Sequence, residues 1–122
     1  DLHEYYGDRF WLSARRQRTE EGDVIEQQIA REAVRAVTDA GADMPDDDYL
    51  PGSFFEKLEN GAYLLIAGQR GEGLNLSDFA AHTYGLAYTI ETGMQCSFED
   101  RVRIQKVAAM TAIRQFEEQC RK

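Results

Sequence analysis

The segment AYLLIAG (residues 62–68) is a continuous apolar run that follows Gly61 and ends at Gly68. Short unbroken runs of this kind are typical of strands that are covered on both faces, as in sheets with helices on each side. The segment therefore predicts a buried strand in an α/β sheet, and the neighbouring elements can be interpreted around it.

Two further elements are expected directly downstream of this strand. SDFAAHTYG (residues 77–85) predicts a short helix that Ser77 caps and Gly85 stops. LAYTIET (residues 86–92) predicts a strand whose alternate side chains point to opposite sides of the sheet. One side carries Leu86, Tyr88 and Ile90, and the other carries Ala87, Thr89 and Glu91.

The chain is expected to end in a long helix that begins near Ser97. Ser97 and Asp100 approximate a capping box, in which the serine oxygen accepts a backbone N–H of the first turn. The apolar residues that follow keep helical spacing, which indicates one apolar face. They are Phe98, Val102, Ala109, Ile113, Phe116 and Cys120.

The upstream half predicts one more helix and several short segments. DVIEQQIAREAVRAVTDAG (residues 23–41) has the apolar stripe of an amphipathic helix, with Asp23 as its N-cap and Glu26 three residues later. Residues 1–3 and RFWL (9–12) are expected to be extended, and FFEKLENG (54–61) to form a helical turn. RRQR (15–18) and ADMPDDDYLPGS (42–53) are expected to be solvated loops.

This alternation of strands and helices predicts an α/β fold. The expected architecture is part of a mixed, mostly parallel sheet flanked by helices on both faces. Three or four short strands alone would leave long open edges, so residues 1–122 are expected to be one part of a single larger domain.

The composition excludes some classes of partner. The formal net charge is −8, which disfavours nucleic acid because binding phosphates needs clustered lysine and arginine. No apolar run approaches the ~20 residues that span a bilayer, so no membrane partner is expected. Cys96 and Cys120 have no metal-motif spacing, and two free thiols fit a reducing compartment such as the cytoplasm.

Two residues at expected strand ends are candidates for chemistry, His3 and Glu91. Ligands of open α/β sheets bind beyond the carboxyl ends of strands, and a buried carboxylate needs a partner such as a metal or its water. Asp1 could orient a zinc-bound His3 by accepting its second ring N–H. The simpler alternative is that both residues are exposed, as terminal histidines and strand-end glutamates usually are.

Three stretches in this order resemble the C-terminal half of the zinc carboxypeptidase superfamily, which includes the metallocarboxypeptidases and the succinylglutamate desuccinylase and aspartoacylase branch. They are DLHEYYGDRFWL (1–12), TYGLAYTIETG (83–93) and SFEDRVRIQKVAAMTAI (97–113). The resemblance implies a three-layer sandwich fold, His3 as the third ligand of one zinc ion, and Glu91 as the catalytic glutamate. It implies a hydrolase that cleaves an amide bond in a peptide C-terminus, a cell-wall peptide or an N-acyl amino acid.

The chain departs from the family pattern in one large respect. The first two zinc ligands of the family lie in a His-x-x-Glu motif, but neither His3 nor His82 has a glutamate three residues later. The other ligands are therefore expected from an absent N-terminal half, as a separate or cleaved chain, and this chain alone is expected to be inactive. No residue matches the substrate-carboxylate anchor, and Tyr84 and Tyr88 match the mobile tyrosine of the peptidases only by their position near Glu91.

Two alternatives remain open from the sequence. The chain could be a non-catalytic α/β interaction module in which His3 and Glu91 are placed by coincidence. It could also be a degenerate member of the family that keeps the fold and has lost zinc. The substrate, the oligomeric state and the compartment are left open by the residues.

Overall fold

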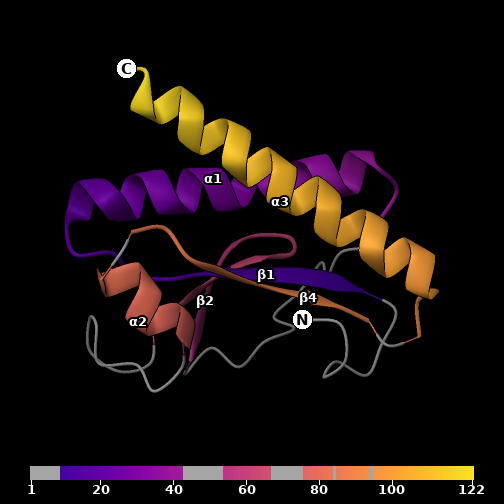
Figure 1. Cartoon of the computed structure of the whole chain (residues 1–122). Helices are drawn as coiled ribbons and strands as arrows, with labels where there is room; N and C mark the ends of the chain where they lie inside the picture. The colour runs from indigo at the N-terminus through magenta and orange to yellow at the C-terminus, as the bar shows by residue number, and fades with distance from the viewer. Residues whose placement is uncertain (1–8, 43–53, 67–75, 84, 94) are drawn as a thin grey trace.

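The computed structural model describes residues 9–42, 54–66, 76–83, 85–93 and 95–122. The expected strand at 1–3 and residues 43–53 of the expected loop at 42–53 lie outside these residues. The described elements, in chain order, are β1 (Phe10–Ala14), α1 (Glu20–Asp39), β2 (Phe55–Glu59), β3 (Ala62–Leu65), α2 (Leu76–Thr83), β4 (Tyr88–Thr92) and α3 (Phe98–Cys120) (Figure 1).

The sheet has the strand order β2-β3-β1-β4. β1 runs parallel to β3 and antiparallel to β4, and β2 runs antiparallel to β3. The α/β class and the mixed sheet are therefore confirmed. The expectation of a mostly parallel sheet is wrong for the described strands, because one pairing is parallel and two are antiparallel.

One antiparallel pairing comes from a hairpin, where a helical turn was expected. Residues 55–59 form β2 rather than a helical turn, and Asn60 and Gly61 connect it to β3. Gly61 has a φ of 84°, a conformation that glycine adopts without steric cost. Asn-Gly between two strands is a strong hairpin signal, which the glutamate and lysine residues around it obscured.

Helix α1 begins four residues earlier than expected. Its N-cap is Thr19, whose hydroxyl accepts a hydrogen bond from the N–H of Gly22 at 3.0 Å. Asp23 is not the cap and lies inside the first turn, where its carboxylate accepts the N–H of Gln17 at 2.6 Å. The capping of α3 by Ser97 is confirmed, because its hydroxyl accepts the N–H of Asp100 at 3.1 Å.

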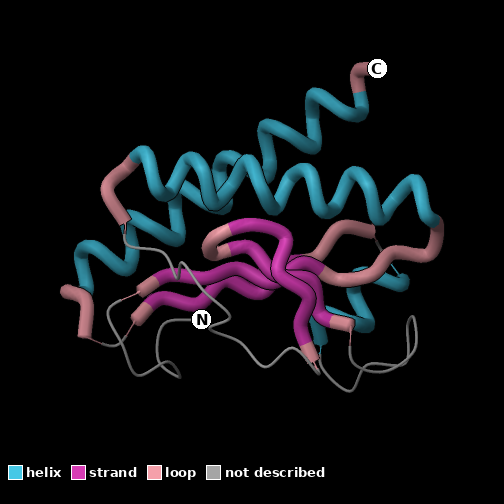
Figure 2. The backbone as a smooth tube through the Cα atoms, turned by 180° about the vertical axis from the view of Figure 1, so that it is seen from behind, coloured by secondary structure: helices cyan, strands magenta, loops and turns pink. Residues whose placement is uncertain are grey.

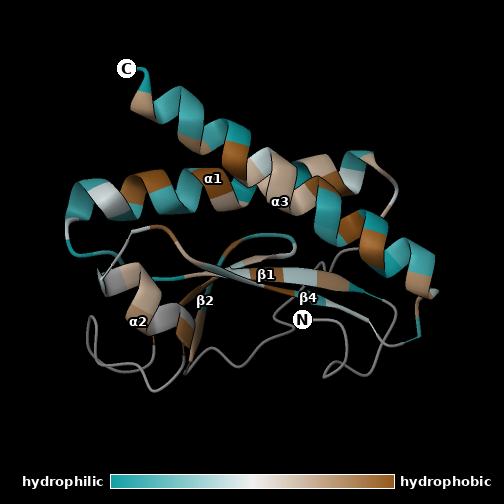
Figure 3. Cartoon of the chain, in the orientation of Figure 1, coloured by the Kyte–Doolittle hydropathy of each residue, from teal (hydrophilic) through white to brown (hydrophobic). Residues whose placement is uncertain are grey.

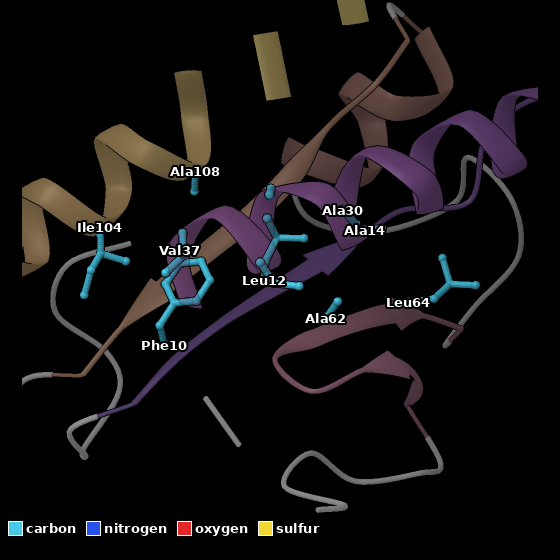
Figure 4. Close-up of a cluster of buried hydrophobic side chains, with 11 residues drawn as sticks. Phe10, Leu12, Ala14, Ala30, Val37, Ala62, Leu64, Ile104 and Ala108 are labelled. Carbon is cyan, nitrogen blue, oxygen red and sulfur yellow. The ribbon is translucent and has the colours of Figure 1, made fainter. Parts of the chain in front are cut away.

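The hydrophobic core lies between the sheet and the two long helices (Figure 4). The side chains of β1 that face α1 are Phe10, Leu12 and Ala14, and each is at most 1% exposed. Small residues line the facing side of α1, which allows the helix to lie close to the sheet. The core residues from the helices are Ala30, Ala33, Val34, Val37, Ile104 and Ala108.

Both long helices lie on the same face of the sheet, which we call the helix face (Figure 2). The short helix α2 lies on the opposite side, near one end of the sheet (Figure 1). The described residues therefore give one full helical layer and only a short helix on the second face. Among the helices that the structure describes, none combines the length and apolar character needed to cross a bilayer.

Helix α3 has two apolar faces, and only one of them is buried. Ile104, Ala108 and Thr111 face the core. Hydrophobic bands recur along the length of the helix (Figure 3). Phe98, Val102, Ile113 and Phe116 are each between 43% and 64% exposed.

Candidate functional site

Glu91 is a buried carboxylate at the end of β4. Its exposure is 7%, so the simple interpretation of a solvent-exposed strand end is wrong. Tyr88 and Ile90 pack against the core on the helix face. Because side chains alternate along a strand, Thr89 and Glu91 point to the second face, as the sequence predicted.

Trp11 lies directly opposite Glu91 on the neighbouring strand β1. Its indole Nε1 is buried and has no hydrogen-bond partner in the described part of the chain. The ring packs edge-to-face against Phe55 and Tyr63, with centroid distances of 6.1 and 6.4 Å. A fixed aromatic donor beside a buried carboxylate is chemically suited to a polar ligand.

Arg15 places a positive charge on the same face of the sheet. Its guanidinium donates to the hydroxyl of Ser13 at 2.6 Å and to the hydroxyl of Thr89 at 2.7 Å. Thr89 is two residues before Glu91, a separation of about 7 Å along a strand. Arg15 and Gln17 are each 5% exposed, so the expectation of a solvated loop at 15–18 is wrong for these two residues.

Glu26 is a second buried carboxyl group, on the helix face. It is fully buried, and its oxygens accept the backbone N–H of Arg15 at 3.1 Å and the side-chain amide of Gln17 at 3.3 Å. Burial raises the pKa of Glu26 to about 8, although hydrogen bonds and the Arg15 charge partly oppose this shift. Glu26, in the second turn of α1, therefore holds the connection between β1 and α1 against the helix through these hydrogen bonds.

Tyr88 belongs to this second group and not to the surroundings of Glu91. Its hydroxyl donates to the backbone carbonyl of Glu26 at 3.0 Å. Burial, followed by the nearby charge of Glu26, raises the pKa of Tyr88, so the phenol stays protonated and remains a donor. Tyr88 is on the opposite face from Glu91 and does not fit a mobile tyrosine. Tyr84 lies outside the described residues.

Of the two site residues predicted from the sequence, the structure describes only Glu91. His3, together with Asp1, lies outside the described residues. His3 precedes Phe10 by seven residues, so an extended chain keeps it within about 25 Å of Phe10. Phe10, the first residue of β1, pairs with Thr92, the neighbour of Glu91.

The described residues do not by themselves form a metal centre. Within that part of the chain, no three His, Cys, Asp or Glu side chains are grouped so that they could hold an ion. A zinc site usually needs three protein ligands, and the described residues alone do not group that many.

Sequence reasoning missed Glu26, although the pattern held a signal. Glu26 precedes Ile29 by three residues and Ala30 by four, so it falls on the apolar stripe of α1. A carboxyl group on that stripe must be buried with partners, and those partners come from residues 15–17.

Comparison with known proteins identifies no relatives of this chain. No family model matches it, and no curated protein and no solved structure is significantly similar to it.

Proposed function

We propose that this chain is the C-terminal part of a zinc-dependent hydrolase that cleaves an amide bond. In this proposal Glu91 is the general base, and His3 is one ligand of a single zinc ion. The remaining ligands come from an N-terminal half with a His-x-x-Glu motif, as a separate or cleaved chain. That half also extends the sheet into a larger, three-layer sandwich.

The observation that carries the proposal is the burial of Glu91 at the end of β4. A carboxylate that is 7% exposed lies largely out of contact with solvent, and buried carboxylates are common in active sites. The Trp11 donor and the positive charge of Arg15 support a polar site on this face.

The chemistry follows from the roles of the chain's own residues. A zinc ion, when bound, supplies a Lewis acid that lowers the pKa of water and polarises the scissile carbonyl. His3 would hold the ion through a ring nitrogen, and Asp1 would accept the other ring N–H and fix the orientation of the imidazole. Glu91 would accept a proton from the attacking water and pass it to the leaving nitrogen.

The proposed substrates would all be cleaved by the same reaction, the hydrolysis of an amide bond. A peptide C-terminus, a cell-wall peptide and an N-acyl amino acid each need attack of water on an amide carbonyl. The residues described on the second face are mainly aromatic near Trp11 and polar near Thr89. Such a surface suits a substrate with an apolar side chain beside its amide group.

The two histidines of the chain provide a matched test of the zinc site. In the complete enzyme, His3→Ala should weaken zinc binding by more than the ~10- to 100-fold that loss of an outer-shell partner causes. His82→Ala, a control on α2, should leave zinc binding unchanged. Metal analysis of the purified proteins gives the result, and equal zinc content in both variants would exclude His3 as a ligand.

A second candidate function is a non-catalytic interaction module, which the exposed apolar face of α3 favours. The same zinc analysis distinguishes it from the hydrolase. A complete protein that contains no zinc would support the module, or a family member that has lost its metal.

A further inference from the structure

A polar groove with a volume of about 240 Å³ lies between α1 and α3. Its residues from α1 are spaced as positions i, i+3, i+4 and i+7 beginning at Glu32, and those from α3 keep the same spacing beginning at Thr111. Each wall is therefore one face of one helix. The two helices cross, and the C-terminal end of α3 diverges from α1 (Figures 1 and 2). The groove is separate from the second face of the sheet, to which Glu91 points.

Thr111 is the most deeply buried residue of this groove. It is 7% exposed, and its hydroxyl has no hydrogen-bond partner in the part of the chain that the structure describes. Thr38 of α1 shows the usual alternative, because its hydroxyl donates to the carbonyl of Val34 at 2.9 Å. A buried hydroxyl without a partner costs free energy, which a hydrogen bond to a bound molecule would recover. The groove therefore contains a polar group that the described residues leave unsatisfied.

Some of the charged residues of the groove neutralise one another. The guanidinium of Arg35 donates to both carboxylate oxygens of Glu59, at 3.1 and 3.0 Å. Its remaining terminal nitrogen donates to Glu32 at 3.0 Å. Arg35 and Glu32 are thus paired within the protein, so a ligand would have to be bound by the other charges of the groove.

Three charged groups of the groove form no ion pair with the residues that the structure describes. They are Asp39 on the α1 wall, and Arg114 and Glu118 on the α3 wall. The Nε of Arg114 donates to the carbonyl of Met110 at 3.4 Å, a hydrogen bond that leaves both terminal nitrogens for a ligand. Two carboxylates disfavour a simple anion, and Arg114 disfavours a simple cation. A molecule that carries one charge of each sign complements the groove best.

We propose that this groove binds a free α-amino acid. The carboxylate of the amino acid would accept hydrogen bonds from Arg114, and its ammonium group would lie beside Asp39 and donate to the hydroxyl of Thr111. The volume suits one amino acid and is too small for a longer peptide. Because the charged groups are exposed, the expected affinity is low, with Kd on the order of millimolar. The proposal is independent of zinc and of Glu91.

An NMR titration of the 122-residue chain with L-alanine tests the ligand class. The expected result is saturable chemical-shift changes on both walls of the groove. N-acetyl-L-alanine lacks the ammonium group and L-alanine amide lacks the carboxylate, so each should bind at least ~10-fold more weakly. Absence of saturable changes, or equal binding of either blocked compound, overturns the proposal. Equal binding of the amide would indicate a cation site, and equal binding of the acetyl compound an anion site.

Arg114→Gln tests the contact with the ligand carboxylate. It should weaken L-alanine binding about 10-fold, because it removes a charged hydrogen-bond donor from the α3 wall. Lys106→Gln makes the same change in charge at an exposed position of α3 outside the groove, and should leave binding unchanged. Equal weakening by the two variants would show a general effect of charge and contradict a site at Arg114.

Thr111→Val tests the hydroxyl with two measurements that should move in opposite directions. Valine has nearly the same shape and lacks the hydroxyl, so the free energy of unfolding without ligand should rise. L-alanine binding to the same variant should weaken, because the ligand ammonium group loses an acceptor. A purely structural role of Thr111 would leave binding unchanged. A variant that binds L-alanine like the wild type, or that is less stable than the wild type, contradicts the proposed role of this hydroxyl.

Discussion

Glu91→Gln is expected to lower kcat of the complete enzyme by about 10²-fold or more while the zinc content stays unchanged. Glutamine has nearly the same shape as glutamate, so the buried position at the end of β4 stays filled. It cannot accept a proton from water near neutral pH. If Glu91 is the general base, the loss therefore falls on the chemical step, and KM changes little.

The matched control for this experiment is Glu56→Gln on β2. Glu56 is exposed, so the same chemical change there should leave kcat, KM and thermal stability close to wild type. Glu91→Asp adds a second comparison, because it keeps the base but draws it back by one methylene group; its kcat should lie between those of wild type and Glu91→Gln. Wild-type turnover in Glu91→Gln would remove Glu91 from the mechanism.

The second large effect concerns stability, and it arises from Glu26. Its pKa is about 8 in the folded chain, raised from 4.5 by burial. The folded state therefore keeps a proton that the unfolded state releases between these two values. The contribution to stability is fully present below pH 4.5 and is lost as the pH rises through 8, at about 1.4 kcal/mol per pH unit across most of the window.

Glu26→Gln should remove this pH dependence. The amide oxygen can still accept the N–H of Arg15, and the amide of Gln17 can turn to accept from the new NH₂ group. Urea unfolding between pH 5 and pH 8 gives the free energy of unfolding for both proteins. The wild-type value should fall relative to the variant as the pH rises, so that the variant is the more stable protein at pH 8.

Other groups titrate in the same range, so the informative quantity is the difference between the two proteins. Glu21→Gln, an exposed position in the first turn of α1, is the control and should follow the wild-type pH profile. If the difference between wild type and Glu26→Gln stays constant from pH 5 to pH 8, Glu26 titrates at the same pH folded and unfolded, and the account of its burial is wrong.

Local signals in the sequence were sufficient to predict the helices and most strands. Ser97 capped α3 as predicted, and the alternation along β4 correctly placed Glu91 opposite the core-facing side. The local pattern gave the wrong start of α1, where two neighbouring residues could each serve as the N-cap. Thr19 and Asp23 are both good N-cap residues. Asp23 does not cap the helix, because its carboxylate accepts a hydrogen bond from the backbone N–H of Gln17.

Burial could not be predicted from one helix alone. The spacing of Phe98, Val102 and Ile113 is typical of a face that packs on a core, yet these residues are exposed in the described chain. The buried face of α3 is instead the side with Ile104 and Ala108, which meets α1. Which of two apolar faces is covered depends on the neighbouring helix, and that information is not in the local pattern.

The candidate site was predicted only in part for a similar reason. The sequence located Glu91 and its direction, but not the donors around it. Trp11 and Arg15 reach the same face from β1 and the residue that follows it, about 80 positions away in the chain. Their placement depends on the register between β1 and β4, which no short motif specifies.

The claim that His3 and Glu91 share one zinc ion can be tested directly by a crystal structure of the complete enzyme with zinc-edge anomalous data. We expect a single anomalous peak about 2.0–2.1 Å from a ring nitrogen of His3. The carboxylate of Glu91 should not bind the ion, but should lie within hydrogen-bond reach of a water molecule beside it. A structure in which no zinc peak lies near His3, or in which Glu91 is too far from the ion to contact its water, would contradict the proposed function.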